Sequence, residues 1–178
     1  MTNTAGKQLG TKALFQQQQQ SLNRQAKPGP VIIADGLRTP ENIGGLMRLA
    51  DAMGSRRVVL VDDMRIDISG KKISRIARET EKSIEIDCVS KNEFLHNCSG
   101  LQPMIALELT TCAESLLNVK LPEQCSLVIG SERHGISEEI LDKCQRAVFI
   151  PMYGINGSMN VTHALAIALY EWRKQHAG

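Results

Sequence analysis

Apolar residues along this chain gather in short runs, separated by longer stretches in which apolar and polar positions recur with helical spacing. The short runs are rich in Val, Ile and Leu, which is typical of strands buried on both faces of a sheet. They predict strands over residues 31–34, 57–61, 83–89, 104–109, 126–130 and 147–150. The longer stretches predict helices over residues 40–53, 71–80, 92–98, 113–117, 137–144 and 161–174. Strands that alternate with helices predict an α/β fold, in which a mostly parallel sheet is flanked by helices.

Two of the predicted helices carry recognisable end signals. Gly54 directly follows the helix over 40–53 and can close it. Ser137 is an N-cap candidate for the helix over 137–144, and Glu138 and Glu139 suit the positive end of its dipole.

The 178 residues are enough for one folded domain, and the composition divides the chain in two. Residues 1–29 are poor in apolar side chains and contain an unbroken run from Gln16 to Gln20. A stretch of that kind cannot bury enough surface to fold alone, so we expect a flexible N-terminal extension followed by a domain over 30–178.

The net charge of +2 is unevenly distributed. Residues 1–30 have no acidic side chain and carry +4, which leaves −2 for the rest of the chain. The basic residues of this stretch are Lys7, Lys12, Arg24 and Lys27. A basic tail is a common way to hold a polyanion, although a solvated leader has the same composition. The basic-rich stretch over 56–82 likewise fits either a solvated face or an RNA-backbone contact.

Several classes of protein are disfavoured by what the sequence lacks. No apolar run reaches the length of a membrane span or a signal peptide, so we expect neither a membrane protein nor an exported one. The five cysteines are scattered and form no Cys-x-x-Cys pair, which favours reduced thiols in the cytoplasm. His96 and Cys98 are close together, but no second pair completes a metal site, and we expect no metal.

Three polar segments follow predicted strands, over residues 39–54, 128–137 and 150–172. In a parallel sheet the strand ends that precede them lie at one edge, where α/β proteins bind ligands. No Gly-x-Gly-x-x-Gly, P-loop or Gly-x-Ser-x-Gly motif is present. Taken singly, Asn42 and Asn160 fit ordinary helix termini and Arg48 fits a solvated surface charge. Only their combination in one chain favours an enzyme.

The three segments resemble the signature motifs of the SpoU (TrmH) branch of the SPOUT RNA methyltransferases. The first motif is Asn42-Ile43-Gly44-Gly45 with Arg48, and the second runs from Gly130 to Ile136 as GSERHGI. The third is Ile150-Pro151-Met152 followed by Gly157-Ser158-Met159-Asn160-Val161. Their order and spacing match, and the similarity extends over residues 31–174.

This resemblance implies a fold and an activity that composition alone does not. The sheet would contain a deep C-terminal trefoil knot, the SPOUT α/β knot, which binds S-adenosylmethionine. The protein would be a homodimer that methylates a ribose 2′-hydroxyl of tRNA or rRNA, with tRNA slightly favoured by the compact chain. An RNA-binding module without catalysis and an unrelated small-molecule α/β enzyme are the alternatives.

The resemblance also implies roles for individual residues. The catalytic positions would be Asn42, Arg48, Glu132, Ser158 and Asn160. The cofactor would be lined by Leu107, Glu108, Leu109, Gly130, Ile150, Ser158 and Met159, the last standing where leucine is more usual. Arg48 matches the proposed proton acceptor of the family. Because arginine normally stays protonated, we expect it instead to stabilise the developing alkoxide or to clamp a phosphate.

Overall fold

The computed structural model describes residues 27–64 and 83–176, together with residues 10, 13, 16 and 17. The helix predicted over 71–80 and most of the proposed N-terminal extension lie outside the described residues. Among the described residues, no helix is long and apolar enough to cross a membrane.

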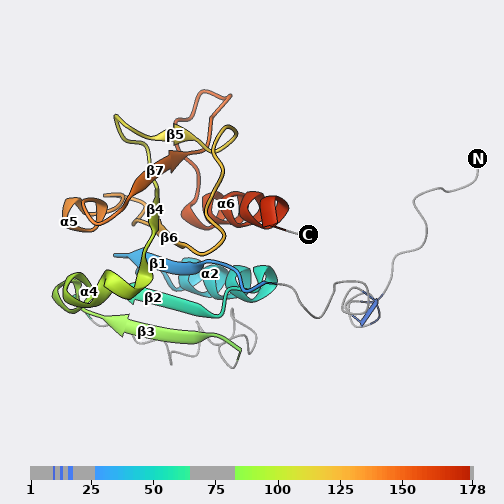
Figure 1. Cartoon of the computed structure of the whole chain (residues 1–178), viewed down its shortest axis with the longest axis horizontal. Coiled ribbons are helices and arrows are strands. Elements are labelled where there is room, and N and C mark those ends of the chain that lie inside the picture. The colour runs from blue at the N-terminus through green and yellow to red at the C-terminus, as the bar shows by residue number, and fades with distance from the viewer. Residues whose placement is uncertain (1–9, 11–12, 14–15, 18–26, 65–82, 177–178) are drawn as a thin grey trace, which may run out of the picture.

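A seven-stranded sheet forms the centre of the molecule (Figure 1). Its strands lie in the order β3-β2-β1-β6-β4-β7-β5, and every pairing between neighbours is parallel. The strands are β1 (Val31–Asp35), β2 (Arg57–Val61), β3 (Glu85–Val89), β4 (Met104–Leu107), β5 (Glu114–Ser115), β6 (Ser126–Ile129) and β7 (Arg146–Phe149). The helices are α2 (Pro40–Met53), α4 (Lys91–Asn97), α5 (Glu138–Leu141) and α6 (Val161–His176), with a 3-10 turn, η2 (Cys98–Leu101). The predicted α/β fold with a parallel sheet is confirmed.

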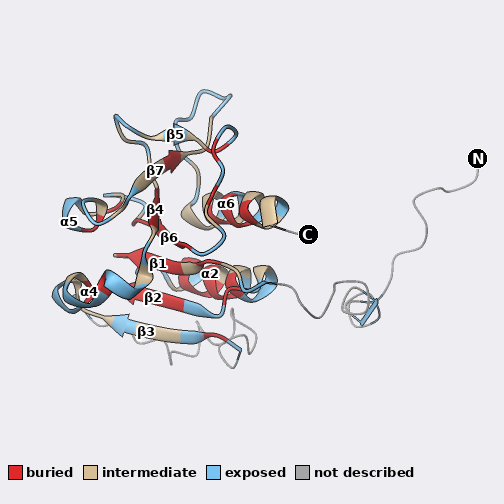
Figure 2. Ribbon diagram, in the orientation of Figure 1, coloured by how far each residue is buried: buried red, intermediate tan, exposed pale blue. Residues whose placement is uncertain are grey.

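Each face of the sheet has its own hydrophobic core. Because side chains alternate along a strand, Ile32 and Ala34 of β1 point to one face while Ile33 points to the other. The first face packs against α2 and α6, and the second packs against α4 and α5. Figure 2 shows the central strands in red, the colour of buried residues, between these helices. Burial on both faces explains why the strands appear in the sequence as continuous apolar runs.

Helix α2 has the bounds that the sequence predicts. Pro40 occupies the first turn, where its missing N–H costs no hydrogen bond. Gly54 ends the helix with φ 73°, a left-handed conformation that side-chain-bearing residues adopt only with strain. Ile43, Leu46, Met47 and Ala50 form the buried stripe, so the packing of α2 on the sheet also fixes the position of its first turn.

Helix α6 is held to the sheet by a buried stripe that ends in Trp172. Leu165, Ala168, Leu169 and Trp172 recur at helical spacing and are fully buried. The indole Nε1–H of Trp172 donates a hydrogen bond of 2.9 Å to the carbonyl of Pro122. The helix is thereby attached to the loop that enters β6.

Two predicted helices differ from the structure. The helix predicted over 113–117 is wrong, because Glu114–Ser115 forms β5, which pairs with Val148 and Phe149 of β7. The next residue, Leu116, donates its N–H to the carbonyl of Phe149 at 2.8 Å. Helix α5 is confirmed but is only four residues long, Glu138–Leu141. The other described elements begin and end within a few residues of their predicted bounds.

We expect Trp172→Phe to lower the free energy of unfolding by about 1–3 kcal/mol, because the smaller ring leaves space and the Pro122 carbonyl loses its donor. Urea unfolding followed by circular dichroism measures this change, since Trp172 is the single tryptophan of the chain. Leu117→Ala is the control, because that side chain is exposed and lies away from α6. A midpoint for Trp172→Phe equal to that of the control would show that the hydrogen bond contributes no stability.

Candidate functional site

The candidate residues lie at the carboxyl edge of the sheet. The neighbouring strands β1, β6, β4 and β7 are followed there by Gly36, Gly130, Glu108 and Ile150 respectively. Parallel pairing brings these strand ends side by side, which is where open α/β sheets bind their ligands. The structure therefore places the starts of all three polar segments on one edge.

Asn42 joins the three segments through its side-chain amide. Its Nδ2 donates to Oε1 of Glu132, and its Oδ1 accepts a hydrogen bond of 3.1 Å from Nδ2 of Asn160. Asn42 is buried in the first turn of α2, whereas Glu132 follows β6 and Asn160 precedes α6. Residues up to 118 positions apart are connected by this one amide.

Asn160 also shapes the start of α6. Its Oδ1 accepts hydrogen bonds from the backbone N–H of Thr162 at 2.9 Å and from the hydroxyl of Thr162 at 2.6 Å. An oxygen that accepts from the second residue of a helix acts as an N-cap. The side chain of Asn160 thus donates to Asn42 on α2 and accepts from Thr162 on α6, so it positions the two helices relative to each other.

The loop after β6 is a tight turn. Ser131 and Gly135 exchange two backbone hydrogen bonds, of 3.1 and 2.9 Å. A Cβ atom on Gly130 would overlap the backbone of Gly135 and Ile136, so this position accepts only glycine without movement of the loop. The turn holds Glu132 at its tip, within reach of Asn42.

The residues expected to line a cofactor lie in three adjoining places. Leu107 ends β4 beside β7, and the N–H of the next residue, Glu108, donates to the carbonyl of Val148 at 3.0 Å. Gly130 is at the neighbouring end of β6, and Ile150 directly follows β7. Leu109 is exposed, as is Ser158, while Met159 is half-buried. The carboxylate of Glu108 accepts from the N–H groups of Leu109 at 2.9 Å and Ile136 at 3.2 Å, so it braces the loop after β6.

Arg48 and Ser158 lie outside this network. Arg48 is exposed on α2, and it forms no hydrogen bond or ion pair with any residue of the described ranges. Six residues along an α-helix correspond to about 600° of rotation, which turns Arg48 about 120° away from Asn42. Within one chain, the structure brings together Asn42, Glu132 and Asn160, but not all five predicted catalytic residues.

Two further acidic groups at this edge were not predicted from the sequence. Asp35 is buried, and its Oδ2 accepts from both the N–H and the hydroxyl of Ser137 at 2.7 Å. This is why the hydroxyl of Ser137 does not cap α5. Asp62 follows β2, and its side chain is 1% exposed. An acidic residue at the carboxyl end of an apolar run was the available signal in both cases.

Asp62 forms a bidentate ion pair with Arg38. Arg38 donates from Nε to Oδ2 at 2.6 Å and from a terminal nitrogen to Oδ1 at 3.0 Å. These hydrogen bonds hold the pKa of Asp62 below its usual value, against the opposing effect of burial, and raise the pKa of Arg38. The N–H of Met64 also donates to Oδ1 of Asp62 at 2.8 Å.

A cleft of about 550 Å³ opens between the loops that follow β1, β2 and β6. Its polar lining includes Asp35, Arg38, Asp62, Asp63, Lys91, Glu132, Arg133 and His134. Glu132 belongs both to this cleft and to the Asn42 network. The cleft therefore adjoins the residues expected to act in catalysis.

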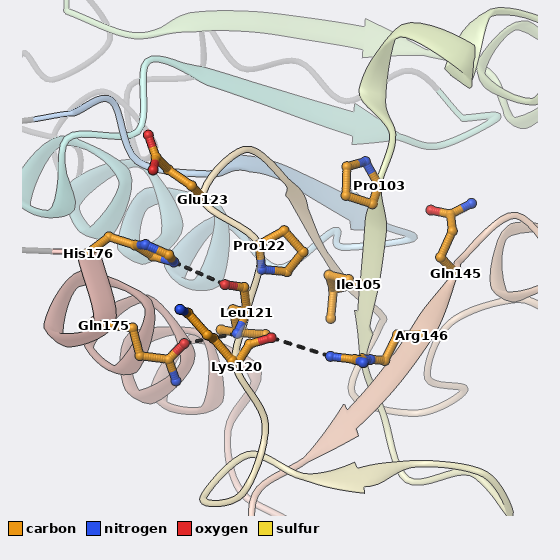
Figure 3. A pocket seen from close by; sticks show the side chains of 10 residues that line it. All are labelled: Pro103, Ile105, Lys120, Leu121, Pro122, Glu123, Gln145, Arg146, Gln175 and His176. Atoms are coloured by element: carbon orange, nitrogen blue, oxygen red, sulfur yellow. Dashed lines mark hydrogen bonds between the residues drawn. The ribbon is translucent and has the colours of Figure 1, made fainter.

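A second cavity, of about 610 Å³, lies around the amino ends of β4 and β7 (Figure 3). The side chains that reach it mostly make structural bonds. Gln175 accepts from the N–H of Leu121, His176 bonds to the carbonyl of Leu121, and Arg146 donates to the carbonyl of Lys120. These contacts fasten α6 and β7 to the loop before β6, so we place the chemistry at the carboxyl edge instead. No group of three or more His, Cys, Asp or Glu residues that could hold a metal occurs among the described residues.

The sequence of residues 29–170 matches the family model described as the SpoU rRNA Methylase family. The chain belongs to this family. The match covers α2, the strands of the sheet and the part of α6 up to Tyr170, and so it includes every candidate residue.

Proteins similar to this chain in sequence or fold are named as RNA methyltransferases. A protein of Staphylococcus epidermidis, named as a TrmH family tRNA/rRNA methyltransferase, is 32% identical over 174 residues, which are 92% of this chain and 66% of that protein. The 23S rRNA (adenosine(1067)-2′-O)-methyltransferase of Streptomyces azureus is 30% identical over 82% of this chain and 55% of its own length. A structure from Porphyromonas gingivalis, described as a TrmH-family RNA methyltransferase, has a TM-score of 0.73 and 29% identity over 85% of this chain and 63% of that one. This chain thus spans less than two thirds of the length of each.

We expect Asp62→Asn to flatten the loss of stability in acid. Because the folded pKa of Asp62 lies below that of the unfolded carboxyl, about 3.9, the stability it contributes is complete above that pH. It is lost as the pH falls through the folded pKa. Urea unfolding at several pH values from about 7 to about 3 measures the slope. Equal slopes below pH 4 for the variant and the wild type would refute this role of the ion pair.

Proposed function

We propose that this chain is an S-adenosylmethionine-dependent RNA methyltransferase that transfers a methyl group to a ribose 2′-hydroxyl. The observation that carries the proposal is the hydrogen-bonded network of Asn42, Glu132 and Asn160, since each comes from a different motif of the SpoU family. The network lies at the ligand-binding edge of the sheet. The Streptomyces azureus relative, named as a 2′-O-methyltransferase, supports the same reaction.

The residues expected to hold the cofactor fit such a group. Leu107 and Ile150 supply half-buried apolar surface at the ends of β4 and β7, and Met159, also half-buried, lies just before α6. From Pro151 to Met159, no backbone group is hydrogen-bonded to another described residue, so these N–H and C=O groups are available to a ligand. The loop is exposed and projects beyond β7 (Figures 1 and 2). S-adenosylmethionine would supply an electrophilic methyl group there, and we propose that the knot of the family encloses it.

The protein must align the ribose with the methyl group and assist the loss of the proton of the 2′-hydroxyl. Holding the two reactants in line can contribute about 7–11 kcal/mol. Arg48, a permanent cation, would stabilise the oxyanion that develops as the 2′-hydroxyl loses its proton. Asn42, Glu132 and Asn160 are bonded to one another, so they would fix the loops that surround the substrate. Ser158, exposed in the loop before α6, would bind substrate or cofactor directly.

We propose that the active protein is a homodimer. Ile167 and Tyr170 are exposed apolar side chains on the face of α6 that turns away from Trp172. Tyr153 and Ile155 extend an exposed apolar surface into the loop before this helix. Apolar surface of this kind marks an interface. A second copy would also supply residues that contact Arg48, which has no partner among the described residues of its own chain.

We propose tRNA as the preferred substrate, because the basic residues that precede the folded domain can bind its phosphate backbone. Ribosomal RNA is the competing substrate. We also propose a cytoplasmic location, which is supported by the five cysteines, all of them free thiols.

Incubation of the purified protein with methyl-deuterated S-adenosylmethionine tests the function directly. The substrates are separate pools of tRNA and rRNA that lack their modifications, and the nucleosides are read by mass spectrometry. A labelled 2′-O-methylnucleoside would support the proposal and would identify the RNA. A label on a base would overturn the ribose assignment. No label in either pool, with cofactor binding intact, would favour an RNA-binding module.

We expect Arg48→Ala to lower methyl transfer by about 100-fold or more while S-adenosylmethionine binding is unchanged, because Arg48 acts only on the developing charge. Single-turnover transfer and calorimetric cofactor binding measure the two effects. Lys120→Ala is the control, an exposed cation in the loop before β6. Wild-type transfer by the Arg48 variant would remove this residue from the catalytic set.

We expect the wild-type protein to have twice the 19.6 kDa mass of one chain in light scattering. The double variant Ile167→Asp, Tyr170→Asp would have the mass of one chain, because charge on the α6 face opposes its burial. Met64→Asp, which replaces an exposed apolar side chain after β2, is the control and should stay dimeric. A monomeric wild type would exclude the dimer, and a dimeric double variant would exclude this interface.

A further inference from the structure

The cleft beside the catalytic network contains an arginine that the family motifs do not include. Arg38 lies in the loop between β1 and α2, four residues before Asn42. Glu132 lines the same cleft and accepts the hydrogen bond from Asn42. A nucleotide whose ribose lies against the Asn42 network would therefore have the cleft beside it. The inference that the cleft contacts RNA rests on the proposed function.

Arg38 is held in a fixed orientation. Its Nε and one terminal nitrogen are bound to the two oxygens of Asp62, at 2.6 and 3.0 Å. Asp62 is itself fixed, because its side chain is buried and also accepts from the N–H of Met64. A guanidinium has five N–H donors, so three remain. The Arg38 side chain is 59% exposed, and it lines the cleft. The result is a set of hydrogen-bond donors whose direction is set before any ligand arrives.

The charges in the cleft do not favour a phosphate. Its cations are Arg38, Lys91 and Arg133, and its acids are Asp35, Asp62, Asp63 and Glu132. The charge of Arg38 is compensated by the buried Asp62. A neutral ligand with hydrogen-bonding edges suits such surroundings better than a polyanion does.

The size and the planar groups of the cleft suit a heterocyclic base. Its volume of about 550 Å³ is in the range of small-ligand sites. Arg133 and His134 are exposed planar side chains on its wall, and both arginine and histidine stack on unpaired RNA bases. Edges of such bases carry acceptors that arginine recognises through paired N–H groups.

We propose that this cleft binds an unstacked base of the RNA substrate, and that Arg38, oriented by Asp62, reads an acceptor edge of that base. Arg38 is thus a specificity-determining residue of the methyltransferase. Asp62 is a positioning residue, because it acts through Arg38.

The test compares the double variant Arg38→Ala, Asp62→Asn with the wild type on the RNA that accepts the labelled methyl group. Replacing both partners avoids an unpaired buried carboxylate, and the amide oxygen of the introduced asparagine can still accept from the N–H of Met64. The matched control is Arg146→Ala, Glu114→Gln, which removes an arginine–glutamate pair of 2.9 Å between β7 and β5. We expect kcat/KM to fall about 5- to 150-fold in the first variant, through KM, and to be unchanged in the control.

Two further measurements separate a base contact from its alternatives. The salt dependence of RNA binding should be unchanged, because no phosphate contact is lost, whereas a slope lowered by about one would show a phosphate site and overturn the proposal. Arg38→Lys keeps the charge but loses the paired, planar N–H donors of the guanidinium, so we expect it to be impaired like the double variant. Full activity of this variant would also overturn the proposal. Unchanged kcat/KM in the double variant would do the same while leaving the methyltransferase function intact. A wild type that methylates no RNA would instead overturn the proposed function and this inference together.

Discussion

The site depends on how one buried amide is satisfied. Asn42 lies inside the protein, where an unpaired donor or acceptor would cost stability, and it pairs both: its N–H donates to Glu132 and its oxygen accepts from Asn160. Each partner belongs to a different loop. Satisfying this single side chain therefore fixes the distance between the first turn of α2, the turn after β6 and the start of α6. No backbone contact between these loops is needed for the same result.

Much of the scaffold could be predicted because its causes are local. The strands are apolar runs because both faces of the sheet are buried, and α2 begins at Pro40 and ends at Gly54 for reasons contained in those residues. Parallel strands place their carboxyl ends together, so the shared edge of the three polar segments also follows from the order of elements. The family motifs, rather than periodicity, singled out Asn42, Glu132 and Asn160. Their contact in the structure explains why residues so far apart occur in one pattern.

The parts that could not be predicted depend on partners distant in sequence. Glu114–Ser115 is a strand only because it pairs with β7. The weak helical pattern over 113–117 does not predict that pairing, because β7 is distant in sequence. The hydroxyl of Ser137 looks like a helix cap, yet it bonds to Asp35, 102 residues earlier. Arg38 and Asp62 are separated by 24 residues and a helix. A local pattern can identify a polar side chain at the right edge, but it cannot say which partner will bind it.

The edge of the sheet divides into a preformed part and an open part. Asp35, Asp62 and Glu132 are each bound to a donor from another segment, so these three side chains at the ends of β1, β2 and β6 are held in place without a ligand. Arg48 and the loop from Pro151 to Ser158 have no such partners among the described residues. Holding these groups in one conformation costs conformational entropy. The binding of cofactor, RNA or a second chain must offset that cost. The fold thus holds the side chains beside the cleft in place before RNA binds. The groups that would contact the reacting atoms acquire their partners only when the cofactor, the RNA or a second chain binds.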